Sequence, residues 1–118
     1  RYPFDTVLMA VNVADKYYRS FIENLMPTAV EKRIGIIGIK VPARGRIFDK
    51  GGIITMKEAM TYTLSLPVST IIIGIREVAQ LEENFEIAKE FVQFSADEML
   101  AIEKKAEPHY EYLQYFKE

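Results

Sequence analysis

An apolar segment that ends in an arginine, followed by polar side chains, carries the clearest chemistry in this sequence. The segment Ser69–Arg76 reads Ser-Thr-Ile-Ile-Ile-Gly-Ile-Arg, and Gln80, Glu83 and Asn84 follow at the spacing of one helix face. The segment is rich in β-branched residues and lacks polar alternation. We therefore expect a strand over about Thr70–Gly74 that is covered on both faces.

Arg76 lies where this predicted strand gives way to the next helix. In parallel α/β folds, ligands bind at the carboxyl ends of strands, and anions favour helix N-termini. A guanidinium is suited to a phosphate there, because its planar fork can form paired hydrogen bonds. Gly74 would let a ligand or backbone approach closely. The alternative is a surface arginine paired with Glu77 or Glu82, since exposed arginines are common.

The composition limits the kinds of function to consider. A chain of 118 residues, 49% of them hydrophobic, fits one small domain with a core. Acids and bases are mixed and the formal net charge is −2, which argues against nucleic-acid binding. The absence of cysteine excludes disulfides and thiolate metal sites. No apolar run reaches membrane-spanning length and no signal-peptide pattern opens the chain, so we expect no membrane association and a cytoplasmic location.

Two further apolar segments predict strands, at Phe4–Val11 and at Ile34–Lys40. Asn12 ends the first and either lines a site or turns the chain, the turn being the favoured reading. Between these strands, residues 17–32 predict a helix in two pieces, because Pro27 breaks a continuous helix but suits the start of a new one.

Helix signals are strong in the second half of the chain. Thr55–Glu58 and Ser95–Glu98 match the capping box that opens a helix. A third helix is expected at Glu77–Lys89, with Leu81, Phe85 and Ala88 on one face. The tail after Pro108 is rich in tyrosine and charge, and it either packs back on the surface or is disordered.

The loop after the second strand is rich in glycine and basic residues. Lys40 opens it, and Arg44, Arg46 and Lys50 follow among glycines. Such a loop could wrap a phosphate, but it lacks the spacing of a known phosphate-binding motif, and a solvated loop explains it equally well.

Three strands thus alternate with helical segments, which predicts an α/β fold with parallel strands and Ile34–Lys40 in the middle. The repeat of about thirty to thirty-five residues matches one unit of a barrel of about 250 residues, and also a doubly wound sheet. Three units cannot close a barrel. Because Arg1 opens the chain and a strand follows almost at once, we expect residues 1–118 to be a piece of a longer chain, although N-terminal trimming would leave the same sign.

These motifs resemble the C-terminal part of the aldo/keto reductase family. Phe4–Asn12 resembles its sixth barrel strand, and Ile34–Val41 followed by Ala43-Arg44-Gly45 resembles its seventh strand and loop. The most specific likeness is the run Pro67–Gly74, then Arg76 and Gln80-Leu81-Glu82-Glu83-Asn84, which resembles the eighth strand and cofactor helix.

The resemblance implies a partial (β/α)8 barrel from an oxidoreductase that reduces small carbonyl compounds with NADPH. It places Arg76 near the cofactor's 2′-phosphate and Gln80 beside the adenine ribose. It places Glu83 and Asn84 against the adenine amine, which needs acceptor groups. The implied cofactor site therefore comprises Gly74, Arg76, Gln80, Glu83, Asn84 and Lys40.

The sequence departs from the family pattern at the nicotinamide end. Leu8 stands where many members have a glutamine that binds the nicotinamide amide, and Ile39 where many have a stacking tyrosine. These contacts are therefore in question or replaced by apolar packing. The family's catalytic aspartate, tyrosine, lysine and histidine lie on earlier strands, so whether this chain is an enzyme stays open. Lys40 is not the catalytic lysine, and His109 is expected to be an ordinary exposed histidine.

Three functions are compatible with these patterns. The first is the inactive C-terminal part of an NADPH-dependent reductase. The second is a non-catalytic half-barrel that binds nucleotides or self-associates, and the third is an unrelated doubly wound domain. A three-stranded piece leaves apolar edges and one apolar face without a partner. We therefore expect self-association or pairing with the missing barrel half.

Overall fold

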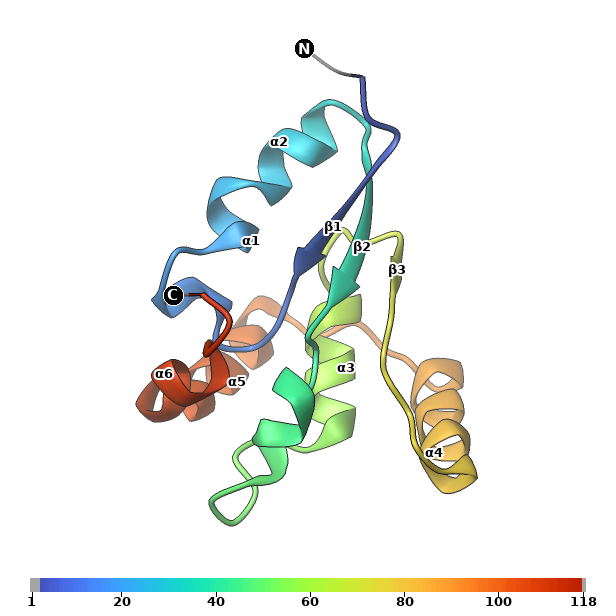
Figure 1. Cartoon of the computed structure of the whole chain (residues 1–118), viewed down its shortest axis with the longest axis vertical. Coiled ribbons are helices and arrows are strands. Elements are labelled where there is room, and N and C mark those ends of the chain that lie inside the picture. Colours follow the sequence, from blue (N-terminus) through green and yellow to red (C-terminus); the bar gives the residue numbers. More distant parts are fainter. Residues whose placement is uncertain (1–2, 118) are drawn as a thin grey trace.

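The computed structural model describes residues 3–117 and contains a three-stranded parallel sheet (Figure 1). Its strands are β1 (Thr6–Ala10), β2 (Gly35–Ile39) and β3 (Thr70–Ile71), in the order β1-β2-β3. Thr6 pairs with Gly35, and Ile37 pairs with Thr70. The predicted α/β fold with parallel strands and a central second strand is confirmed.

The first crossover is helical in pieces, as predicted. It contains a 3₁₀ turn, η1 (Asp15–Tyr17), then α1 (Phe21–Asn24) and α2 (Met26–Glu31). Pro27 lies in the first turn of α2, where its missing N–H costs nothing. Residues of α2 pack on the sheet face formed by alternate strand residues, and this small cluster contains Met9, Val11, Met26, Ala29 and Ile36.

The second crossover contains a 3₁₀ segment, η2 (Ala43–Phe48), and α3 (Met56–Leu64). The predicted loop therefore has a helical turn near its start. The capping box is confirmed, because the Glu58 N–H donates to Thr55 Oγ1 over 3.1 Å and the Thr55 N–H donates to Glu58 Oε1 over 3.0 Å. Helix α3 is largely buried and supplies much of the main core.

Four helical elements follow β3. They are α4 (Val78–Lys89), α5 (Ala96–Ala106), the 3₁₀ turn η3 (Glu107–His109) and α6 (Tyr110–Leu113). The second capping box, at the start of α5, is also confirmed. Helix α5 packs on α3, and the tail folds back so that Lys117 reaches Asp15 of η1 (Figure 1). Of the two alternatives for the tail, packing back on the surface is confirmed for the described residues, and Glu118 lies outside them.

The expectation of a strand covered on both faces was wrong. Only Thr70 and Ile71 pair as strand, and Ile72 and Ile75 are 57% and 43% exposed. The β-branched composition favours extended backbone, but covering requires a neighbour, and nothing among the described residues pairs with the outer edge of β3.

One face of the sheet lies open. The register places Leu8 beside Ile37 on the face opposite α2, and Ile72 continues that face along the neighbouring strand. Leu8 is 55% exposed and Ile37 is partly exposed. The open apolar face expected of a barrel piece is therefore present.

Candidate functional site

The predicted site lies at the junction between β3 and α4. The Arg76 backbone N–H donates to the Gln80 side-chain oxygen Oε1 over 2.7 Å. Gln80 lies in the first turn of α4, so its side chain reaches back to the segment that joins β3 to α4. The predicted helix is present, which places Gln80, Glu83 and Asn84 on neighbouring positions of one face. Gln80 and Glu83 are exposed and Asn84 is partly buried.

The Arg76 side chain is exposed and forms no ion pair with any residue in 3–117. The alternative of a surface pair with Glu77 or Glu82 is therefore wrong for this structure. An exposed guanidinium without a carboxylate partner keeps its hydrogen-bond donors available to an external anion.

Gly74 borders open space next to this arginine. A Cβ added at Gly74 would meet no atom within 4 Å, whereas one added at Gly38 would lie 3.3 Å from Ile71 Cγ2. Packing within the described residues therefore favours glycine at position 38 but sets no limit at position 74. Room for a ligand is one physical reason for glycine there.

Lys40 lies at the same carboxyl edge of the sheet, at the end of β2. Its backbone is in the left-handed region with φ of 61°, and its carbonyl accepts a hydrogen bond from Asn12 Nδ2 over 3.3 Å. Asn12 Oδ1 accepts from the Ala14 N–H over 3.1 Å, so this buried asparagine turns the chain and joins the ends of β1 and β2. The favoured turn reading of Asn12 is confirmed.

In the basic loop after β2, Arg46 forms structural contacts with the tail. Arg46 donates to the Tyr112 carbonyl over 2.8 Å, and its guanidinium lies 4.6 Å from the Tyr112 ring centroid and 4.0 Å from that of Tyr115. Arg46 therefore anchors the tail, while Arg44 remains exposed.

Cavities of about 610 and 390 Å³ flank the tail, and neither is lined by Arg76 or Gln80. His109 lines the larger cavity and is half-buried, not exposed as expected.

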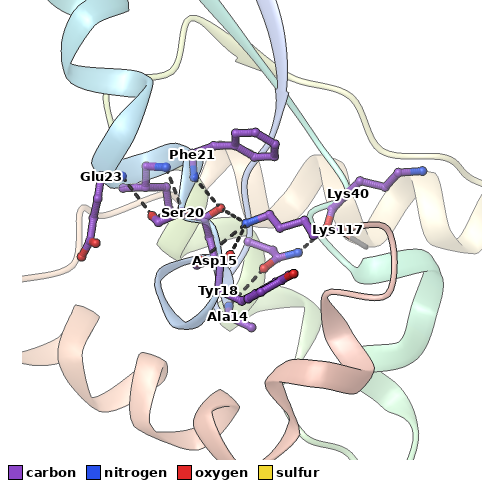
Figure 2. Close-up of polar contacts among 10 residues, drawn as sticks. Ala14, Asp15, Tyr18, Ser20, Phe21, Glu23, Lys40 and Lys117 are labelled. Atoms are coloured by element: carbon purple, nitrogen blue, oxygen red, sulfur yellow. Dashed lines mark hydrogen bonds and ion pairs between the residues drawn. The ribbon is translucent and has the colours of Figure 1, made fainter.

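A buried polar cluster joins the tail to η1 and the start of α1, and sequence reasoning missed it (Figure 2). Lys117 Nζ lies 2.6 Å from Asp15 Oδ1 and also donates to the Tyr18 carbonyl over 3.1 Å. The Asp15 carboxylate further accepts from Ser20 Oγ and from the Phe21 and Ile22 N–H groups. The available signal was a lysine in an aromatic tail, together with an aspartate shortly before a helix-capping serine.

A second polar group links η1, α3 and α5. Tyr62 donates to Glu103 Oε2 over 2.7 Å, and Lys16 pairs with the other oxygen of the same carboxylate over 2.9 Å. Burial and the bond to Glu103 raise the pKa of Tyr62 far above its usual range, so this phenol stays protonated. Tyr62 is therefore a structural hydrogen-bond donor.

Among residues 3–117, no group of acidic or histidine side chains could hold a metal ion, and no helix could span a membrane.

Two solved structures of the aldo-keto reductase AKR11C1 from Bacillus halodurans are similar to this chain. The holo form matches with a TM-score of 0.65 at 18% identity, over 85% of this chain and 42% of that chain. The apo form gives 0.66 and 17%, over 86% of this chain and 43% of that chain. The chain has the fold of part of an aldo-keto reductase barrel. It spans less than half of those structures, and no family model or curated protein matches its sequence.

Proposed function

We propose that this chain is the cofactor-binding, C-terminal part of an NADPH-dependent reductase that acts on small carbonyl compounds. The observation that carries the proposal is the exposed Arg76, without an ion-pair partner in the described residues, next to open space at Gly74. This junction follows the last strand of a partial aldo-keto reductase barrel. A phosphate group fits such a site better than a neutral ligand does.

NADPH, when bound, would supply the hydride, and the protein would supply orientation and charge. Arg76 would bind the 2′-phosphate through charge-assisted hydrogen bonds. Gln80, Glu83 and Asn84 would line the adenosine end from α4, and Lys40 would approach from the end of β2. Gln80 would release or share its bond with the Arg76 N–H on binding. The chain lacks the family's catalytic residues, so we expect no carbonyl reduction by the isolated chain.

The test compares NADPH with NADH, because only NADPH carries the 2′-phosphate. Titration of the purified chain, followed by nicotinamide fluorescence, should give tighter binding of NADPH. Arg76→Ala should weaken NADPH binding about ten- to a hundredfold, since a charged hydrogen bond contributes about 1.5–3 kcal/mol. Binding of NADH should hardly change.

Arg33→Ala is the matched control, because Arg33 is exposed just before β2, at the opposite edge of the sheet from Arg76. Equal losses of NADPH and NADH binding in Arg76→Ala would remove the phosphate role. NADPH binding unchanged by Arg76→Ala would move the site elsewhere. Turnover of a carbonyl substrate by the chain alone would contradict its expected inactivity.

The second candidate function is a non-catalytic half-barrel that assembles with a copy of itself. The observation that favours it is the open face with its exposed Leu8 and Ile72, which lies beside unpaired strand edges among the described residues. Light scattering of Leu8→Lys and Ile72→Lys separates the candidates. If the chain associates through this face, both variants should be smaller particles than the unmodified chain. If the chain instead pairs with the missing half of a barrel, its particle size should change only when that half is added.

A further inference from the structure

Helix α4 carries an apolar stripe that nothing in the described chain covers. Val78, Leu81 and Phe85 follow one another at spacings of three and four residues, so they lie along one side of the helix. They are 69%, 52% and 62% exposed, so the apolar face predicted for this helix from Leu81 and Phe85 lies toward solvent. Just past the helix end, Val92 is also exposed, at 78%.

The side of α4 that meets the body is a different one. Asn84 and Ile87 are its partly buried positions, and Ile87 packs against the main core cluster. In Figure 1, α4 stands beside α3 at the edge of the molecule with its outer side uncovered. A contiguous exposed apolar surface of this kind commonly marks a binding interface.

Charged side chains, mostly acidic, border the stripe on its outer flank. Lys89 lies next to the stripe, four residues after Phe85, Glu82 and Glu86 lie beyond it, and Glu83 and Glu90 lie farther round. None of these four carboxylates forms an ion pair within residues 3–117. Like charges four residues apart destabilise a helix slightly. Lys89 is the single basic side chain of α4, so the carboxylates outnumber it and a cationic neighbour would lower the repulsion that remains.

A second copy of α4 fits the stripe less well than a basic helix does. Two copies packed antiparallel through the stripe bring the same flank of each helix together, with Glu82, Glu86 and Lys89 on both sides. Each lysine can then meet one glutamate of the other copy, but the remaining carboxylates stay without a cation.

We propose that the α4 stripe binds an amphipathic helix whose apolar face is bordered by lysine or arginine residues. Leu81 and Phe85 would be the anchors, and Glu82 and Glu86 would pair with the basic border of the partner helix. Such helix recognition uses anchors at spacings of three, four and seven residues. The inference deepens the proposed function, and rests on it, in holding that this chain works with a second part.

The experiment uses two synthetic helical peptides with one leucine pattern, one bordered by lysines and the other by glutamates. Binding of each labelled peptide to the chain is measured by fluorescence anisotropy at low and high salt. The lysine peptide should bind at least about tenfold more tightly at low salt, and the difference should shrink at high salt because screening weakens exposed ion pairs. Equal binding of both peptides, or binding of neither, would overturn the proposal.

Leu81→Ser and Phe85→Ser should abolish binding of the lysine peptide without changing the circular dichroism spectrum, since both side chains are exposed. Val30→Ser is the matched control, because Val30 is a 48% exposed apolar residue on α2. Retained binding in the two α4 variants would place the peptide elsewhere and overturn the proposal. So would a dimer that these variants convert to monomers.

The cofactor proposal can fail separately from this one. Arg76→Ala should still bind the lysine peptide, and Phe85→Ser should still bind NADPH. Loss of peptide binding in Arg76→Ala would show that the peptide binds at the proposed cofactor site and not on the α4 stripe, which would also contradict the inference.

Discussion

The tail and helix α4 use opposite means to meet the rest of the molecule. At the tail, Lys117 is 8% exposed, and its ammonium is satisfied by Asp15 and the Tyr18 carbonyl, 102 and 99 positions away in the chain. On α4 no residue is buried, and the apolar stripe faces outward. One region satisfies buried charge within the chain, and the other leaves apolar surface without a partner.

This difference between the tail and α4 shows which surfaces of the fold have no partner within the chain. A buried charge requires a partner within the fold, because an unpaired charge in the interior is very costly. Exposed apolar surface lowers stability only gradually, so a folded chain can retain it until another surface covers it. The buried charges of the tail and η1 are therefore paired within the chain, whereas the open sheet face and α4 expose large apolar side chains, among them Leu8, Ile72, Val78, Leu81 and Phe85.

The largest effect expected is from Lys117→Met. This change keeps an apolar stem but leaves the Asp15 carboxylate, at 1% exposure, without its cation. Breaking a buried pair from one side typically costs about 3–5 kcal/mol, so urea unfolding should show a loss in that range. Lys89→Met on α4 is the control and should stay within about 0.5 kcal/mol. Equal, small losses would mean that the tail contributes no more than α4 does.

Local signals explain which parts of the fold were predictable. The capping boxes at Thr55 and Ser95 and the break at Pro27 act within a few residues, and all three are confirmed. The sheet order follows the rule that consecutive strands joined through helical crossovers tend to lie side by side. The exposure of Ile72 was not predictable, because a run of isoleucines reports a preference for burial and not whether a neighbour exists.

The candidate site divides in the same way. Helical spacing was sufficient to place Gln80, Glu83 and Asn84 on one face of α4. The bond from the Arg76 N–H to Gln80 depends on side-chain rotamers, and spacing alone does not specify it. The Asp15–Lys117 contact joins residues 102 apart, which no local pattern in a single sequence reveals.

A second prediction compares two glycines, one in the packed sheet and one at its uncovered end. Gly38→Ala should destabilise the chain by about 1–3 kcal/mol, because its Cβ would lie 3.3 Å from Ile71 Cγ2 and 3.6 Å from Val11 Cγ2. Gly74→Ala should change thermal stability little, since no atom lies within 4 Å of its Cβ. A large loss at position 74 would mean that the end of β3 packs more tightly than its exposure indicates.

A third prediction compares helix caps. Thr55→Ala removes the side-chain cap of α3 and should cost about 1 kcal/mol in urea unfolding. Helix α4 has no side-chain cap at Glu77. Glu77→Ser should therefore add one and increase protection of α4 amides from hydrogen exchange by about 0.5–1 kcal/mol. If Glu77→Ser leaves the protection of the α4 amides unchanged, then packing, and not the uncapped terminus, limits the stability of α4.

The smallest effect expected concerns the pH dependence of the ion pair between Glu58 and Lys105, which joins α3 to α5 over 2.6 Å. Partial burial raises the pKa of Glu58, but the hydrogen bonds and charge from Lys105 and Thr55 outweigh burial and hold it below its usual value of 4.5. A carboxyl whose pKa is lowered by folding stabilises the fold above its unfolded pKa and loses that contribution as pH falls through its folded pKa. The Lys105 side chain is 54% exposed, so the contribution should be no more than about 1 kcal/mol.

Urea unfolding of Glu58→Gln should therefore show a small loss of stability at neutral pH that disappears in strong acid. Glu86→Gln removes an α4 carboxylate without an ion pair in the described residues, and it should cause no loss at neutral pH. If Glu58→Gln keeps its full loss in strong acid, then packing of that side chain, and not its charge, joins the two helices. The contrast between an internally satisfied body and an unpartnered α4 would then rest on the Asp15–Lys117 pair and the Tyr62–Glu103–Lys16 group.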